Sequence, residues 1–282
     1  MTLEEWVRKG EALLRTGPHP DRARRDAELL LRHLLQQERA ALLARWKERL
    51  HENEAAEYLA FLERRHAGEP IQYITAEAEF YGLLFRVTRD VLIPRPETEH
   101  LVEKVIALCG GMQRPRIVDV GTGSGAIAVA LAHGLPDAQI TATDLSAAAL
   151  EIARENAAHN RAAERIRFVQ GDLLHPVAGD QFDVVASNPP YVSTADGASL
   201  AVEVRDYEPE MALFAGSDGM RVYKRLIPQA VDVLVRGGHI ALEIGYGQQQ
   251  AVGALLAASG YHNVEFAADL QGIPRVAVAR RS

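Results

Sequence analysis

Apolar residues recur every three to four positions through most of the first 66 residues, which is the spacing that lines one face of a helix. The segment from Gly17 to Pro20 breaks this pattern, and Asp21 directly after it is expected to cap the second helix. A further helix is expected from Glu52 to His66, before the helix-ending Gly68 and Pro70. The N-terminal part of the chain is therefore predicted to be a small helical bundle.

A different pattern follows between residues 71 and 93. Aromatic and aliphatic residues on both sides of a central glycine predict a β-hairpin, namely Phe80, Tyr81, Leu83, Phe85 and Val87 around Gly82. A helix is then expected from about Glu99 to Leu108. We therefore expect an N-terminal helical domain over residues 1–75, a hairpin linker over 76–92 and a larger domain over 93–282.

Strands and helices alternate from residue 115 onward. The expected strands span residues 116–120, 139–143, 166–170, 182–187, 239–244, 264–267 and 276–280, and the expected helices span 124–133, 146–159, 218–235 and 248–258. This alternation predicts an α/β fold with a doubly wound, mostly parallel seven-stranded sheet and helices on both faces. The last two strands have no helix between them and are expected to pair antiparallel at one edge.

Composition narrows the class of protein. Hydrophobic residues make up 48% and charged residues 24%, as in an ordinary globular protein. No stretch approaches eighteen unbroken apolar residues, and the N-terminus has acids instead of an apolar signal segment. The single cysteine, Cys109, cannot form an internal disulfide, so a reducing cytoplasm is the expected location. The ten histidines show no zinc-like spacing, so no metal is expected.

The charge is unevenly distributed along the chain. Residues 1–75 contain 13 basic and 13 acidic side chains, whereas the remainder contains 18 basic and 25 acidic ones and carries the whole net charge of −7. Tight binding to a phosphate backbone depends on Lys and Arg contacts. An acidic larger domain therefore disfavours a nucleic-acid substrate.

A glycine-rich segment, Asp119 to Gly125, joins the first strand of the expected sheet to its helix. Glycines let the backbone turn tightly and let a ligand approach it, and the helix N-terminus behind them favours carboxylate or phosphate groups. Asp144 ends the next strand, 21 residues after Gly123, where a carboxylate can accept both ribose hydroxyls. Asp172 follows the third strand and can accept from an adenine amino group. These positions predict a site for a nucleoside cofactor.

The glycine loop alone does not identify that cofactor. Gly121, Gly123 and Ala126 also satisfy the dinucleotide pattern G-x-G-x-x-G/A, so S-adenosylmethionine and a nicotinamide cofactor both remain open. The loop lacks the Gly-Lys-Ser/Thr ending of a P-loop, and Thr122 stands where a nucleophile elbow around Ser124 would need glycine. A tight turn that binds no ligand is the structural alternative.

The tetrapeptide Asn188-Pro189-Pro190-Tyr191 follows the fourth strand and favours one chemistry. Ligands bind at the carboxyl ends of parallel strands, so this turn is expected beside the glycine loop. The prolines stiffen it, so that the Asn188 side-chain oxygen and the Pro189 carbonyl can accept both N–H groups of a planar NH₂, with the flat face of Tyr191 nearby. These hydrogen bonds strengthen as positive charge develops on the nitrogen, which favours methyl transfer to an amide or arylamine.

Together these segments resemble the HemK/PrmC family, the N5-glutamine methyltransferases of peptide chain release factors. The resemblance runs from about residue 20 to the C-terminus. Its most specific segments are residues 68–73 (GEPIQY), 80–82 (FYG), 92–99 (LIPRPETE), 119–125 (DVGTGSG), 188–191 (NPPY), 208–209 (EP) and 216–219 (GSDG).

The resemblance implies a Rossmann-like, class I S-adenosylmethionine-dependent methyltransferase domain and an N-terminal domain that helps to hold the release factor, so that the enzyme modulates translation termination. It implies cofactor contacts from Gly121, Thr122, Gly123, Ser124, Gly125, Asp144, Leu173 and Asn188. It also implies that residues 188–191 bind the glutamine of a Gly-Gly-Gln loop, with Asn188, Pro189 and Tyr191 as the catalytic set.

The chain departs from the family pattern at two places. Leu173 stands where an aromatic side chain is frequent, and a leucine packs on adenine but stacks less well. The stretch from Asp269 to Arg275 contains a proline before its arginine, unlike the usual ending. The loop Arg95-Pro96-Glu97 has two interpretations, a cap for the helix from Glu99 or a lid over the cofactor.

Two other functions fit parts of the pattern. Adenine offers the same NH₂ geometry, so a DNA adenine-N6 methyltransferase is an alternative, but it would need a basic target-recognition region and a means of flipping the base. A nicotinamide-dependent oxidoreductase would use the glycine loop and give the 188–191 turn no role. A silent adaptor that docks through its N-terminal bundle is a third.

Overall fold

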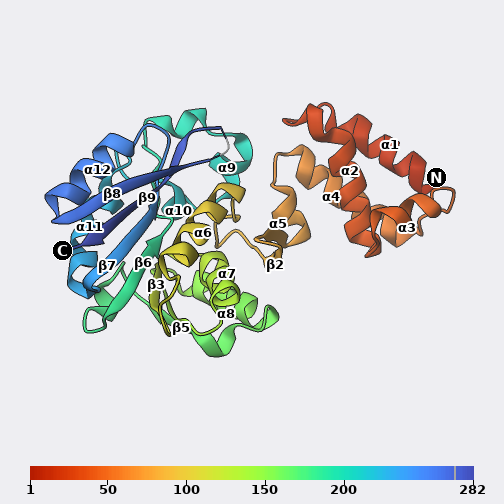
Figure 1. Cartoon of the computed structure of the whole chain (residues 1–282). Coiled ribbons are helices and arrows are strands. Elements are labelled where there is room, and N and C mark those ends of the chain that lie inside the picture. Colours follow the sequence, from red (N-terminus) through yellow and green to blue (C-terminus); the bar gives the residue numbers. More distant parts are fainter. Residues whose placement is uncertain (270) are drawn as a thin grey trace. The chain divides into compact units, whose positions relative to one another are not determined.

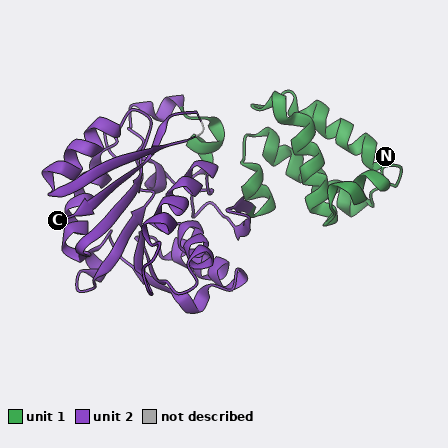
Figure 2. Cartoon of the chain, in the orientation of Figure 1, with its two compact units in different colours: residues 1–77, 200–207 green, residues 78–199, 208–282 purple. Residues whose placement is uncertain are grey.

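The computed structural model describes residues 1–269 and 271–282, and these residues form two compact units (Figure 2). Unit 1 comprises residues 1–77 and 200–207, and unit 2 comprises residues 78–199 and 208–282. None of the helices in the described part of the chain has the length and hydrophobicity of a membrane span. Residues 200–207 are flanked in sequence by unit 2 but fold with the N-terminal residues. The sequence pattern did not indicate this.

Unit 1 is built mainly from helices. Its elements are α1 (Leu3–Leu14), η1 (Pro20–Arg22), α2 (Ala23–Leu35), α3 (Arg39–Ala44), α4 (Glu52–His66), α5 (Ile71–Thr75) and α9 (Val202–Tyr207). Tyr58 and Leu62 of α4 are fully buried against α1 and α2, and the Tyr58 hydroxyl donates to the Ala27 carbonyl at 2.8 Å. The prediction that Asp21 caps the second helix is wrong, because Asp21 lies inside η1 and α2 begins at Ala23 without a side-chain cap.

A buried arginine holds α9 in unit 1. The Arg65 guanidinium is 3% exposed and donates to Asp26 of α2 at 2.7 Å, to Glu203 of α9 at 2.5 Å and to the Glu69 carbonyl at 3.0 Å. A buried charge is tolerated only when it is paired and hydrogen-bonded in this way. Leaving Arg65 without these acceptors would be costly, so residues 200–207 are anchored to the bundle.

Unit 2 contains the predicted α/β sheet (Figure 1). Its strands are β3 (Arg116–Val120), β4 (Gln139–Asp144), β5 (Ile166–Gln170), β6 (Phe182–Ser187), β7 (Leu234–Glu243), β8 (Tyr261–Ala268) and β9 (Pro274–Arg281). Their order across the sheet is β5-β4-β3-β6-β7-β9-β8. The first five are parallel and β9 is antiparallel to both neighbours, so the antiparallel pair predicted at one edge is confirmed.

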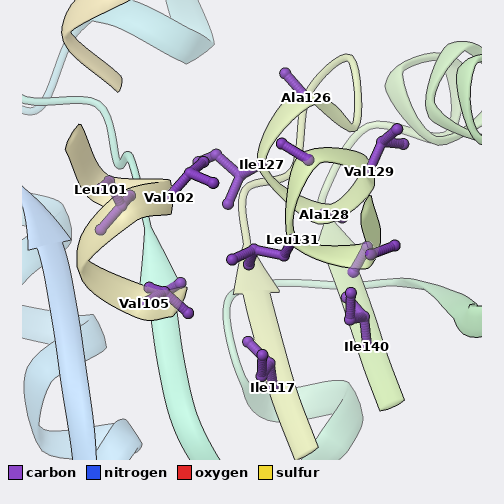
Figure 3. Packing of buried hydrophobic residues seen from close by; sticks show 14 of the residues in the cluster. Leu101, Val102, Val105, Ile117, Ala126, Ile127, Ala128, Val129, Leu131 and Ile140 are labelled. Atoms are coloured by element: carbon purple, nitrogen blue, oxygen red, sulfur yellow. The ribbon is translucent and has the colours of Figure 1, made fainter. Parts of the chain in front are cut away.

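Helices cover both faces of this sheet because its strands alternate apolar side chains between the faces. The longer helices of unit 2 are α6 (Glu99–Leu108), α7 (Ala126–Gly134), α8 (Ala147–His159), α11 (Arg221–Val233) and α12 (Gln249–Ala258). Figure 3 shows one face, where α6 and α7 pack Val105 and Leu131 toward Ile117 of β3 and Ile140 of β4. The opposite face packs under α11 and α12.

The remaining elements of unit 2 are short. They are β1 (Glu77–Phe80), β2 (Leu83–Arg86), η2 (Pro96–Thr98), η3 (Ala163–Arg165), η4 (His175–Val177), η5 (Asp196–Ser199) and α10 (Glu210–Leu213), of which β1 begins one residue before the boundary of the unit. The hairpin β1–β2 forms as predicted, and Phe80 and Phe85 are buried in the core that contains α6 and α7. The hairpin is thus a packed part of unit 2.

Element boundaries differ from the sequence predictions where glycines intervene. The helix predicted to run to residue 235 ends at Val233, and β7 begins at Leu234 with a register shift opposite β6. Gly237 adopts a positive φ of 75°, which few other residues tolerate, and it lets the strand continue through the irregularity. The same helix starts at Arg221, three residues later than predicted, because Gly219 is also at positive φ.

The strand order reverses between β3 and β6, and ligands bind at such switch points in open α/β sheets. Asp119 of β3 lies opposite Ala186 of β6 in the parallel register. One residue beyond, the Ser187 hydroxyl donates to the Val120 carbonyl at 2.6 Å and ties the two strand ends together. The glycine loop and the Asn188 turn therefore leave the sheet side by side.

Candidate functional site

A cavity of about 250 Å³ lies at the carboxyl ends of the parallel strands in unit 2. It brings together seven of the predicted site residues, namely Gly121, Gly123, Asp144, Asp172, Leu173, Asn188 and Pro190. The apolar part of the cavity wall includes Val91, Leu92, Met211 and Phe214. A larger, open hollow of about 630 Å³ lies where β3, β4 and β5 begin, and it contains none of the predicted site residues.

The glycine loop leaves open space for a ligand. Gly121 and Gly123 adopt positive φ angles of 72° and 54°, and a Cβ placed on either would meet no atom within 4 Å. The loop itself is fixed, because the Gly121 and Thr122 N–H groups donate to the Thr143 carbonyl at 2.8 and 3.0 Å. The loop therefore forms a rigid cradle whose open side a bound molecule could fill.

Asp144 is held at the edge of this cradle by two backbone donors. Its Oδ2 accepts the Gly123 N–H at 2.8 Å, and its Oδ1 accepts the Ser146 N–H at 2.9 Å. Burial raises the pKa of Asp144, while these backbone hydrogen bonds oppose the rise. Each carboxylate oxygen keeps lone-pair capacity, so Asp144 can still accept hydroxyl donors from a ligand in the cavity.

Three predicted loop residues do not line the cavity. Thr122 is buried and its hydroxyl donates to Asp119 Oδ2 at 2.6 Å, which stiffens the start of the loop. Ser124 is also buried, and Gly125 caps α7 at a φ of 81° against Ala153. Burial raises the pKa of Asp119 to about 7. Thr122, Ser124 and Gly125 therefore support the glycine loop on the side that faces away from the cavity.

The segment after β5 forms the side of the cavity opposite the loop. Leu173 has a φ of 52°, a left-handed conformation that a branched residue rarely adopts, and its carbonyl accepts the Thr143 hydroxyl at 3.1 Å. Strained backbone of this kind clusters at functional sites. Asp172 is half-exposed and forms an ion pair with Arg225, which also lines the cavity. A ligand donor that reached Asp172 would therefore share its carboxylate with Arg225.

The turn after β6 presents Asn188 and Pro190 to the cavity, whereas Pro189 is buried and Tyr191 is half-buried behind them. The Asn188 Nδ2 donates to the hydroxyl of Thr98 at 3.0 Å. The Asn188 Oδ1 is therefore the end of the amide that is turned away from Thr98. This orientation makes Oδ1 available as an acceptor at the cavity.

Three residues that support this turn were not identified from the sequence. Gln248 Nε2 donates to the Tyr191 carbonyl at 3.0 Å, and the Tyr191 hydroxyl donates to Glu243 Oε1 at 3.4 Å. Thr98, the third, lies in the 92–99 segment, where the sequence showed only a resemblance to the family. The residues around Gln248 do not predict its role, because that role depends on where α12 begins relative to β6.

The loop Arg95-Pro96-Glu97 does not itself line the cavity, although Asp90, Val91 and Leu92 shortly before it do. Arg95 donates to Glu208 at 2.5 Å, and α6 begins without a side-chain cap at Thr98. The capping interpretation is therefore wrong for this loop. In the stretch from Asp269 to Arg275, the Arg275 side chain donates to Asp269 at 2.9 Å, and Leu270 lies outside the described residues.

Comparisons with known proteins agree with this geometry. A family model described as the methyltransferase small domain matches residues 98–204, and one described as the PrmC N-terminal domain matches residues 5–75. Among solved structures, a methyltransferase from Pyrococcus furiosus is 19% identical with a TM-score of 0.53, covering 82% of this chain and all of that one. The hMettl16 catalytic domain, solved with an RNA hairpin, is 18% identical with a TM-score of 0.59, covering 86% and 92%. These two likenesses establish the methyltransferase fold.

Curated relatives are closer in sequence. A release factor glutamine methyltransferase from Koribacter versatilis is 44% identical over all of this chain and 99% of its own length. A protein of the same name from Moorella thermoacetica is also 44% identical with the same coverage, and one from Deinococcus radiodurans is 40% identical. The chain therefore belongs to the release factor glutamine methyltransferase family.

Proposed function

We propose that this protein transfers a methyl group from S-adenosylmethionine to the side-chain amide nitrogen, N5, of the glutamine in the Gly-Gly-Gln motif of peptide chain release factors. The observation that carries the proposal is the hydrogen bond from Asn188 Nδ2 to Thr98, which leaves Oδ1 as the free acceptor of a residue that lines the cavity beside the glycine loop. The names of the curated relatives support the same substrate.

The cavity residues suit the proposed cofactor. The space in front of Gly121 and Gly123 would take the amino-acid part of S-adenosylmethionine close to backbone, Asp144 would accept the ribose hydroxyls, and Leu173 would pack on adenine. When bound, the cofactor supplies an electrophilic methyl group on a positively charged sulfur. The Asn188 turn distinguishes the two candidate cofactors, because hydride transfer to or from a nicotinamide would give this turn no role.

The residues of the turn would prepare the glutamine nitrogen for methylation. An amide nitrogen is a weak nucleophile because its lone pair is delocalised into the carbonyl. The Asn188 Oδ1 and the Pro189 carbonyl would accept its two hydrogens, fix its direction and stabilise the positive charge that grows on it. An alkylated amide nitrogen is strongly acidic, so water can take the proton and no side-chain base is required.

Unit 1 is proposed to help hold the release factor. Residues 5–75 match the PrmC N-terminal domain, and residues 1–75 carry equal numbers of basic and acidic side chains. A bundle without excess positive charge fits a protein partner better than a phosphate backbone. We therefore propose a protein substrate and no direct nucleic-acid substrate.

The test is methyl transfer to defined substrates. The protein is incubated with S-adenosylmethionine and either a purified release factor or duplex DNA, and mass spectrometry follows each substrate. One added methyl on the Gly-Gly-Gln glutamine is expected. Asn188→Ala should lower this rate by about a hundredfold or more while the circular dichroism spectrum is kept. Methylation of DNA alone, or full activity of the variant, would contradict the proposal.

A further inference from the structure

The turn between β5 and η4 holds a leucine in a strained backbone conformation at the cavity. The His175 N–H donates to the Asp172 carbonyl at 3.2 Å and closes this turn. Leu173 occupies its second position with a φ of 52°, where glycine, asparagine or aspartate is usual. Leu173 lines the cavity, so the turn places an apolar side chain there. A strained conformation of this kind persists only where its surroundings hold it.

Hydrogen bonds to two side chains fix the backbone around Leu173. The Thr143 hydroxyl of β4 donates to the Leu173 carbonyl at 3.1 Å. At the next residue, the Leu174 N–H donates to the Gln229 Oε1 of α11 at 3.2 Å. Leu174 is 2% exposed, so water has little access to replace this acceptor, and a buried N–H without a partner is costly. The Gln229 side chain is therefore what satisfies the Leu174 amide.

The same part of α11 reaches the cavity itself. Arg221, Val222 and Arg225 line it, and Gln229 follows Arg225 by one helical turn without lining it. Arg225 forms an ion pair with Asp172, the first residue of the turn after β5. The two side chains of this pair are 45% and 40% exposed, and exposed ion pairs contribute little to stability. Among the polar contacts from α11, the one made by Gln229 should therefore matter most.

We propose that Gln229 is a positioning residue for the cofactor, which acts by holding Leu173 where the adenine of S-adenosylmethionine packs. This inference rests on the proposed function, because it takes the cavity to be the cofactor site. Gln229 does not line the cavity, so its effect must pass through the backbone of the turn. Without this acceptor, the Leu174 N–H has to move toward another one, and the strained Leu173 relaxes away from the cavity.

The proposal predicts a loss of cofactor affinity and not of chemical rate. Leu173 would contact adenine both before and during methyl transfer, so its displacement weakens binding equally in the ground state and the transition state. In a Gln229 variant without an acceptor, KM for S-adenosylmethionine should rise while kcat at saturating cofactor stays within about threefold. A fall in kcat with an unchanged KM would contradict the proposal, because a loss of folded protein alone gives that result.

The experiment compares Gln229→Met and Gln229→Glu with the wild-type protein by calorimetry with S-adenosylhomocysteine. Gln229→Met has a similar shape but no acceptor oxygen, and it should raise the Kd at least about tenfold. Gln229→Glu keeps an acceptor and should stay within about threefold. Gln181→Met is the matched control, because Gln181 also binds α11, at the Asp232 carbonyl, but lies outside the cavity. Its Kd should stay within about twofold of the wild-type value.

A double-mutant cycle tests whether Gln229 acts through Leu173. Leu173→Ala keeps a residue with a side chain in the strained conformation but removes most of the surface that would contact adenine. In that background Gln229→Met should change the Kd by less than about threefold, because the group that Gln229 positions is gone. Equal losses of affinity in the two backgrounds would overturn the positioning role.

The binding measurements need no release factor, so they separate this inference from the proposed substrate. Failure of the wild-type protein to bind S-adenosylhomocysteine would overturn the proposed cofactor, and this inference with it. Normal wild-type binding together with an unchanged Kd in Gln229→Met would overturn the inference alone. A loss in Gln229→Glu equal to that in Gln229→Met would do the same, because the acceptor oxygen would then have no role.

Discussion

The side chain of Gln248 binds the Asn188 turn to the start of α12. Its Nε2 donates to the Tyr191 carbonyl at 3.0 Å, and its Oε1 accepts the Gly245 N–H at 3.0 Å. The same Nε2 lies 3.4 Å from the Gly219 carbonyl. Tyr191, Gly219 and Gly245 therefore meet around one amide, and the position of the turn depends on how closely these backbones approach.

Gly219 allows the closest of these approaches. A Cβ at this residue would lie 2.3 Å from the Tyr191 carbonyl oxygen, and its φ of 69° is already unfavourable for other residues. We expect Gly219→Ala to push the turn away from the glycine loop and to lower kcat at least about tenfold, because small displacements of positioning groups are costly in rate. Steady-state kinetics with a release factor would measure the change.

Gly247→Ala is the matched control for backbone strain. Gly247 has a φ of 79°, but a Cβ there would meet nothing within 4 Å. Both variants should lose similar stability, about 1–2 kcal/mol, from the left-handed conformation. Only Gly219→Ala should lose turnover, and equal kcat values in the two variants would show that contact with Tyr191 is unimportant.

Asp144 is predicted to control cofactor affinity. Its two oxygens accept the Gly123 and Ser146 N–H groups, and an asparagine could accept only one of them. Hydrogen bonds to a charged group contribute about 1.5–3 kcal/mol, so Asp144→Asn should weaken S-adenosylhomocysteine binding at least about tenfold. Calorimetry would measure the Kd. Asp137→Asn, an exposed change outside the cavity, should leave it unaltered, and an unchanged Kd in Asp144→Asn would contradict this role.

The local patterns of the chain predicted much of the fold. Alternating strands and helices gave the seven-stranded sheet, and the strand ends carried the glycine loop, Asp144 and the Asn188 turn to one edge. These predictions succeeded because side-chain periodicity and glycine or proline turns act over a few residues. The wider set of site residues that the resemblance implies remains a prediction.

The parts that the sequence did not predict depend on contacts between distant segments. Thr98 is 90 residues from Asn188, and Glu243 is 52 residues from Tyr191, so no spacing rule connects them. The segment 200–207, which contains α9, is a similar case. It folds with unit 1 because Arg65 binds Glu203, which is 138 positions away in the sequence. The placement of such groups is decided only when the whole domain packs.

Asp119 gives a prediction for stability against pH. Burial raises its pKa from 3.8 to about 7, with the charge of Asp144 adding to the effect. Between these values the folded state binds more protons than the unfolded state, so the free energy of unfolding falls as the pH rises and levels off above about pH 7. Asp119→Asn cannot titrate and keeps an oxygen for the Thr122 hydroxyl. In denaturant unfolding from pH 5 to 8, the stability of the wild-type protein minus that of Asp119→Asn should fall up to about pH 7 and then level off, since other groups cancel in the difference. A difference that stays constant would show that Asp119 is not protonated in the folded protein at pH 5.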